Sequence, residues 1–171
     1  RRQRQMCIRD SFTKDEEYWA YQEANPADVY HFAPPCTNLS RAHTKPQVRT
    51  VENPYGNEAD PEVKACNDLV RLLADRVARQ VKAGATVLIE NPLGSFLWEL
   101  TEMKELLATE GFHFFRTDYC MKGTLYQKPT AFLTNSDRLP EWVAEVCTHV
   151  KPHAERLQGG GQTRRAVSYT H

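Results

Sequence analysis

A cysteine and a glutamate each follow an apolar run of this chain, and as a pair they could attack an electron-poor ring. The run Val29-Tyr30-His31-Phe32 stops at Pro34-Pro35, and Cys36 follows at once. Proline has no backbone N–H and a fixed φ, so a central strand cannot continue through two prolines. Cys36 is therefore expected on a loop, where a thiol can act as a nucleophile. A lone cysteine is more often a packing residue, so this assignment needs a partner.

The partner that the sequence offers is Glu90. It closes the nearly all-apolar run Ala85-Thr86-Val87-Leu88-Ile89 and opens the motif Glu90-Asn91-Pro92. A carboxylate at the end of a buried strand costs desolvation energy unless another group pairs with it. The structural alternative is a glutamate that caps the next helix or forms an ion pair with an arginine. A thiolate beside a glutamate suits addition to a ring that the glutamate activates by protonation or hydrogen bonding.

The elements that must position these residues alternate between strand and helix. We expect strands over 29–32, 85–89, 112–119 and 131–134, and helices over 14–25, 95–109 and 141–147. A further helix begins at Pro61 after the N-cap Asp60 and stops at Gly84, and residues 34–54 form a long loop. This order predicts an α/β fold with a mainly parallel sheet and helices on both faces. The ends of parallel strands meet at one edge, so Cys36 and Glu90 should converge.

Composition sets the broad class of the protein. The 171 residues suit one domain, and Lys+Arg equals Asp+Glu at 22 each, so net charge favours no class of partner. No apolar run approaches the roughly 18 residues that span a bilayer, and no secretory signal is visible. The five cysteines are odd in number and form no Cys-x-x-Cys pair, which favours a reduced compartment, the nucleus or cytoplasm. We expect no membrane partner and favour a monomer.

Three segments resemble, in family order, motifs of the DNA cytosine-5 methyltransferases. Residues 33–40, Ala-Pro-Pro-Cys-Thr-Asn-Leu-Ser, resemble the Pro-Cys-Gln-x-x-Ser motif, and Glu90-Asn91-Pro92 resembles the Glu-Asn-Val motif. Residues 119–135, with Gly123, Lys128 and Phe132, resemble the Tyr-Gly-x-x-Gln-x-Arg-x-Arg-x-Phe segment. The likeness is closer still to a methylase-like group of viruses and mobile elements with Pro-Pro-Cys, Glu-Asn-Pro and Tyr-Cys-x-x-Gly…Lys-Pro-Thr. The chain departs from the family pattern at Thr37, Pro92 and Thr130.

The resemblance implies a Rossmann-like class I methyltransferase sheet, incomplete at the N-terminus, and a residue-by-residue mechanism. Cys36 would add to carbon 6 of a cytosine flipped out of its duplex, and Glu90 would bind ring nitrogen 3 and the exocyclic amine. Carbon 5 would then take a methyl group from S-adenosylmethionine. Ser40 and Arg41 would hold the DNA backbone, and Lys128 would keep a positive charge beside the base or a phosphate. DNA is the expected partner, with RNA left open.

The cofactor site implied by the resemblance is incomplete. Pro34 and Asn91 are its expected S-adenosylmethionine contacts. The family's Gly-rich loop lies upstream of the Pro-Cys motif, and the 35 residues before Cys36 contain none. We therefore expect an N-terminally truncated fragment that is inactive alone. The alternatives are a non-catalytic nucleic-acid-binding remnant and a cysteine hydrolase, although neither His31 nor His43 lies in a context typical of its base.

The domain boundaries follow from this interpretation. Residues 1–11 resemble translated sequencing-adapter read-through and are interpreted as a non-native or disordered extension, a basic nucleic-acid-binding arm being the alternative. Residues 12–150 would be the partial catalytic domain and 151–171 a loose tail. Cys147, His149 and His153 are metal ligands by type, but no fourth partner is evident and we assign no metal. Cys120 is interpreted as a packed thiol.

Overall fold

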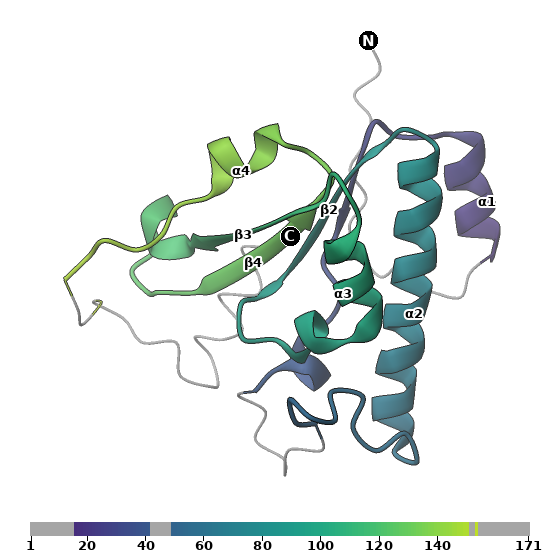
Figure 1. The fold of residues 1–171 in the computed structure, drawn as a ribbon, viewed down its shortest axis with the longest axis horizontal. Helices are drawn as coiled ribbons and strands as arrows, with labels where there is room; N and C mark the ends of the chain where they lie inside the picture. Colours follow the sequence, from purple (N-terminus) through teal and green to yellow (C-terminus); the bar gives the residue numbers. More distant parts are fainter. Residues whose placement is uncertain (1–15, 42–48, 151–152, 154–171) are drawn as a thin grey trace.

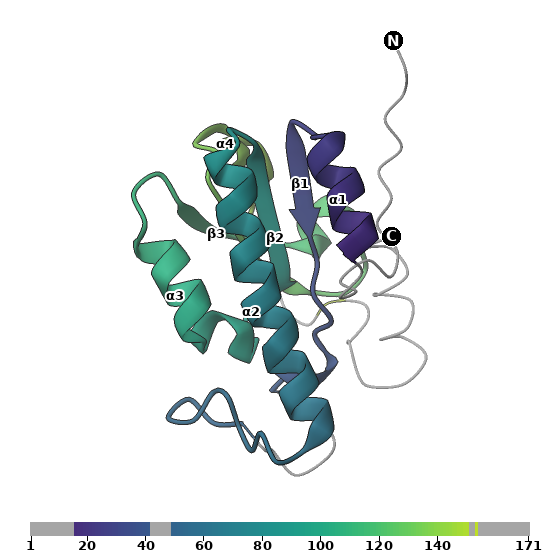
Figure 2. The same ribbon diagram turned by 90° about the vertical axis from the view of Figure 1, so that its right-hand side faces the viewer.

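The protein forms a four-stranded sheet with its main helices on one side (Figures 1 and 2). The computed structural model describes residues 16–41, 49–150 and 153; the predictions for residues 1–11, for His43 and for most of 151–171 lie outside this part. In chain order the elements are α1 (Glu16–Ala24), β1 (Val29–Phe32), the 3-10 turn η1 (Thr37–Leu39), α2 (Pro61–Lys82), β2 (Thr86–Pro92), η2 (Phe96–Glu99), α3 (Thr101–Ala108), β3 (His113–Asp118), η3 (Tyr119–Lys122), β4 (Pro129–Thr134) and α4 (Arg138–Val143).

The sheet has the strand order β1-β2-β4-β3, which confirms an α/β fold. β1 and β2 are parallel, with Phe32 opposite Ile89, and α2 supplies the crossover between them. The expectation of a mainly parallel sheet is wrong. The sheet is mixed, because β4 pairs antiparallel with both β2 and β3. The physical reason is the connection from β3 to β4, residues 119–128, which is shorter than the dozen or so residues that a parallel crossover needs.

One face of the sheet carries the core. Trp19 of α1, Leu73 of α2 and Met103 of α3 are buried in the same cluster as Phe32 and Ile89 of the sheet. Figures 1 and 2 show all three helices on this side. Helices on both faces were expected; in the part of the chain that the structure describes, the remaining helix α4 lies instead beside β3, at the edge of the sheet (Figure 1).

Local sequence explains where α2 begins but not where α4 ends. The Asp60 carboxylate accepts hydrogen bonds from the first turn of α2, whose first residue is Pro61, as expected. The predicted helix over 141–147 is wrong at both ends: α4 begins at Arg138 and stops at Val143, and Ala144 is already extended. The reason is tertiary, since Glu145 forms a parallel bridge with Thr117 at the edge of β3. Over the residues described, the chain contains no helix with the length and hydropathy to cross a bilayer.

Candidate functional site

Glu90 is a buried acidic group on the face of the sheet opposite the core. It was expected just after a strand, but β2 continues through Pro92, so Glu90 lies inside the strand. The extension comes from β4, which pairs Phe132 with Glu90 and Thr130 with Pro92. Its side chain is 7% exposed. A carboxylate this deep requires partners, and the structure supplies them.

Three side chains from three different elements surround the Glu90 carboxylate. The Tyr119 hydroxyl donates a hydrogen bond of 3.0 Å to Glu90 Oε1. His31 Nε2 lies 3.5 Å from Glu90 Oε2 but is not aimed as a hydrogen bond, and this buried nitrogen has no other hydrogen-bond partner among the residues described. The Lys128 ammonium lies 4.9 Å from the centre of the Tyr119 ring and adds positive charge near the carboxylate. Glu90 therefore lies beside a hydroxyl donor, an imidazole and an ammonium group.

These contacts decide the charge of Glu90. Burial by itself raises the pKa of the carboxyl group, but the interactions with His31, Lys128 and Tyr119 outweigh burial and leave the pKa below the ordinary value of 4.5. Burial and the neighbouring carboxylate raise the pKa of Tyr119 above its usual range, so its hydroxyl stays a donor. The site thus presents an ionised acceptor at neutral pH.

The Cys36 loop is hydrogen-bonded to β2, the strand that contains Glu90. Pro34 is buried, and its carbonyl oxygen accepts a hydrogen bond of 2.9 Å from Asn91 Nδ2. Cys36 follows as a half-buried free thiol at the start of η1, where its carbonyl accepts from the Leu39 N–H. The Ser95 hydroxyl then donates to the Leu39 carbonyl. The Pro-Pro-Cys and Glu-Asn-Pro motifs, far apart in sequence, are therefore joined directly.

A buried arginine that the sequence did not single out joins η1 to residues 54 and 55 and to α2. Arg49 is 1% exposed, and burial lowers its pKa. It donates to the carbonyls of Asn38, Pro54, Tyr55 and Val63 and to the side chain of Asn67. Its planar fork of donors suits this task, which a single ammonium could not perform. No local pattern in the polar segment 41–54 distinguishes Arg49 from its neighbours.

The expected substrate-binding residues occupy different environments. Arg41 is exposed and pairs with Glu99 at 3.2 Å, and its guanidinium stacks over the Phe96 ring. Ser40 is half-buried after η1. Lys128 is half-buried and lies near Glu90, as described above, and Thr130 is fully buried in β4. Lys128 is thus the expected contact residue that the fold brings to the glutamate.

The expected cofactor contacts fit S-adenosylmethionine only in part. The Pro34 carbonyl is already an acceptor for Asn91, whereas Asn91 Oδ1 is buried and has no hydrogen-bond partner in the described chain. One open acceptor is compatible with an additional ligand. It does not make a cofactor site, and the described residues do not fit S-adenosylmethionine as a complete set.

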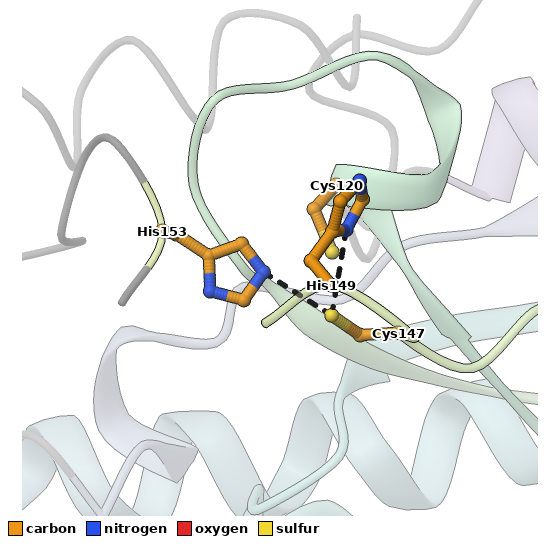
Figure 3. A group of neighbouring side chains, drawn as sticks. All are labelled: Cys120, Cys147, His149 and His153. Carbon is orange, nitrogen blue, oxygen red and sulfur yellow. Dashed lines mark hydrogen bonds between the residues drawn. The ribbon is translucent and has the colours of Figure 1, made fainter. Parts of the chain in front are cut away.

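A second group of chemically active side chains lies at the β3 edge. Figure 3 shows Cys147, His149 and His153 together with Cys120, the fourth partner that the sequence left unidentified. The signal that could have found it was the cysteine directly after a strand-ending tyrosine. The intervening chain is too long for spacing to indicate the contact.

The comparisons do not place the chain in a family. Searches against protein-family models, curated proteins and solved structures found no match. A functional conclusion therefore depends on the chemistry of the two residue groups described above.

Proposed function

We propose that this chain is the substrate-binding and base-activating part of a cytosine-5 DNA methyltransferase-like protein. The observation that carries the proposal is the hydrogen bond from Asn91 to the Pro34 carbonyl, which couples the Cys36 loop to the strand of Glu90. A nucleophile on the loop after β1 and an ionised carboxylate in the adjacent parallel strand β2 suit attack on a protonatable ring. The mixed, open α/β sheet is compatible with an incomplete fold of this type.

The lowered pKa of Glu90 supports a defined part in this chemistry. An ionised carboxylate favours a cytosine ring that carries a proton on nitrogen 3, since the two groups then form a charged hydrogen bond. It also accepts from the exocyclic amine. A protonated ring is electron-poor at carbon 6, which is where the Cys36 thiolate would add. The base must leave the duplex, because the thiolate approaches from above the ring plane.

Groups near Glu90 and on the Cys36 loop support substrate binding. The buried Nε2 of His31 lacks a hydrogen-bond partner in the described chain, which is typical of a group that meets a ligand. The Lys128 ammonium can meet a phosphate or base oxygen. The exposed pair of Arg41 with Glu99 is worth at most about 1 kcal/mol, so a phosphate could displace the glutamate.

S-adenosylmethionine would supply the methyl group. The described residues do not form its site, so no methyl-transfer step is assigned to them. The part of the reaction assigned to this chain is the reversible addition of a thiolate to the ring, which requires no methyl donor.

That addition can be tested directly by hydrogen exchange at carbon 5. When the Cys36 sulfur bonds to carbon 6, carbon 5 becomes nucleophilic and takes a deuteron from heavy water. Loss of the original proton from carbon 5 and departure of the thiolate restore the ring with deuterium in place of hydrogen. We expect the proton NMR signal of cytosine H5 in single-stranded and duplex DNA to disappear over time with the wild-type chain.

Variants show which side chains are responsible for the exchange. Cys36→Ser should abolish the exchange and Glu90→Gln should slow it at least tenfold, whereas Cys66→Ser, at a half-buried thiol on α2, should leave it unchanged. No exchange by the folded wild type would overturn the proposal. Binding to DNA without exchange would support the alternative of a non-catalytic nucleic-acid-binding remnant, and the same rate with Cys36→Ser would remove Cys36 as the nucleophile.

A further inference from the structure

Four side chains with metal-binding atoms converge beside β3 (Figure 3). Their ligand atoms, the sulfurs of Cys120 and Cys147 and ring nitrogens of His149 and His153, all lie within 4.8 Å of one another. Cys147 Sγ is 3.2 Å from His153 Nε2 and 3.6 Å from His149 Nδ1. Both imidazoles therefore direct a nitrogen at the same sulfur.

These separations match the edges of a zinc tetrahedron. With Zn–S bonds of about 2.3 Å and Zn–N bonds of about 2.0–2.1 Å, tetrahedral ligand atoms stand roughly 3.3–3.8 Å apart. The two sulfur–nitrogen distances already lie at or near this range. The widest separation in the group, 4.8 Å, requires a closure of about 1 Å, which side-chain rotation can supply.

Hydrogen bonds and an ion pair within the protein bring the ligands together. The backbone N–H of Asp118 donates to the Glu145 carbonyl at 2.8 Å, and the N–H of Cys147 donates to the Asp118 carboxylate at 2.8 Å. Lys122, two residues after Cys120, pairs with the Glu145 carboxylate at 2.7 Å. The extended segment after α4 is thus fixed along β3 with its cysteine against η3.

The hydrogen bond to the Cys147 backbone also orients a ligand in the way that metal sites use outer residues. Asp118 is fully buried and is held by Arg116 at 2.8 Å, so its carboxylate is already occupied. It is a supporting group and not a fifth ligand. The spacing His149-x-x-x-His153 is that of the histidine pair in structural zinc sites.

We propose that Cys120, Cys147, His149 and His153 bind one Zn²⁺ ion in a closed, structural site. Both thiols lose their protons to solvent on binding, so two thiolates balance the charge of the ion and two neutral imidazoles complete its coordination. Two sulfurs and two nitrogens in a tetrahedron select zinc over the hard cations calcium and magnesium. With all four positions filled by protein, the ion has no open position for catalysis.

The site connects the C-terminal segment to the candidate active site. Cys120 directly follows Tyr119, the residue that donates to Glu90. A metal that fixes Cys120 against Cys147 also fixes η3, from whose first residue the Tyr119 side chain reaches the glutamate. Zinc therefore stabilises the fold around Glu90 without touching a substrate.

Metal content of the wild-type chain is the first test. The 171-residue chain is prepared without a histidine tag, reduced, loaded with zinc and desalted, and its metal is measured by elemental mass spectrometry. We expect close to one zinc per chain. Replacement by Co²⁺ should give the intense visible bands of tetrahedral cobalt together with a near-ultraviolet sulfur-to-cobalt charge-transfer band, which report geometry and thiolate ligation without any variant.

The variants identify the ligands. Cys120→Ser and Cys147→Ser should each weaken the charge-transfer band and reduce zinc affinity at least tenfold, and His153→Gln should shift the visible bands. The matched controls Cys66→Ser and His113→Gln, outside the cluster, should bind like the wild type. Circular dichroism checks that each variant is folded. Where a variant is unfolded, the cobalt spectrum of the wild type decides whether a tetrahedral site with thiolate ligands exists.

Three results would overturn the site. The first is a folded, reduced wild type that retains no zinc and gives no tetrahedral cobalt spectrum. The second is a cobalt spectrum that Cys120→Ser leaves unchanged. The third is a disulfide between Cys120 and Cys147 that forms in the presence of equimolar zinc, since a thiolate committed to the metal cannot also be oxidised.

Discussion

Asn91 donates a hydrogen bond of 2.9 Å to the carbonyl oxygen of Pro34, although the two residues lie 57 positions apart. One amide thereby fixes the backbone two residues before Cys36 to the residue directly after Glu90. The parallel register brings the strands together, with Phe32 opposite Ile89, and this hydrogen bond continues the alignment beyond the end of β1. The proposed nucleophile and the proposed activating carboxylate therefore depend on a shared contact.

Removal of that contact should release the Cys36 loop. Asn91→Ala should lower the free energy of unfolding by about 1–2 kcal/mol, because a buried carbonyl loses its donor. Cys36 should then react faster with an alkylating reagent, as followed by peptide mass spectrometry alongside urea unfolding. Asn57→Ala, at an exposed turn, is the control and should change stability by less than about 0.5 kcal/mol. An unchanged alkylation rate for Asn91→Ala would show that the amide does not restrain the loop.

Glu90 should make stability depend on pH in a defined direction. Its pKa in the folded chain lies below the ordinary 4.5, so its contribution is fully present above that value and is lost as the pH falls through the folded pKa. Glu90→Gln should therefore lower the free energy of unfolding at neutral pH and have much less effect in acid. Urea unfolding across pH measures the difference. Glu105→Gln, an exposed carboxylate on α3, should show no such pH dependence; a Glu90→Gln penalty independent of pH would contradict the assignment.

The Tyr119 hydroxyl should help to keep Glu90 ionised. Tyr119→Phe removes a hydrogen bond of 3.0 Å to the carboxylate, so the pKa of Glu90 should rise. Carboxyl-carbon NMR titration measures this shift directly. The loss of a hydrogen bond to a charged group should also cost about 1.5–3 kcal/mol at neutral pH. Tyr21→Phe on the exposed surface of α1 is the matched control, and an unchanged Glu90 titration in Tyr119→Phe would rule out the coupling.

Arg49 should be one of the costliest positions in the described chain. Arg49→Leu leaves several buried acceptors without a donor and should reduce stability by about 3 kcal/mol or more, measured by urea unfolding. Arg49→Lys keeps the charge but should recover less than half of this loss, because one ammonium cannot replace a planar fork of donors. Arg71→Leu, at an exposed salt-bridge arginine, should cost no more than about 1 kcal/mol. Equal losses of stability in Arg49→Leu and Arg71→Leu would mean that the burial of Arg49 is not the cause of its effect.

Much of the local structure could be read from the sequence. β1 has the bounds that its apolar run and the two prolines predict, and α2 begins at the Asp60-Pro61 signal. Both patterns are local, since a proline or an N-cap acts on backbone groups within a few residues of itself. The pairing of β1 with β2 was also accessible, because a helix of this length between two apolar runs predicts a parallel crossover.

What the tertiary structure alone decided is how distant segments meet. The sequence determined that Glu90 closes an apolar run and needs a partner; it could not identify Tyr119 and His31, which reach the carboxylate from other elements. Strand β4 decided that β2 runs on through Pro92, and the edge of β3 decided that α4 stops before Cys147. The same edge brings Cys147 to Cys120. Each of these contacts joins residues that are far apart along the chain and belong to no periodic pattern. The contacts therefore form only when the sheet brings the segments together.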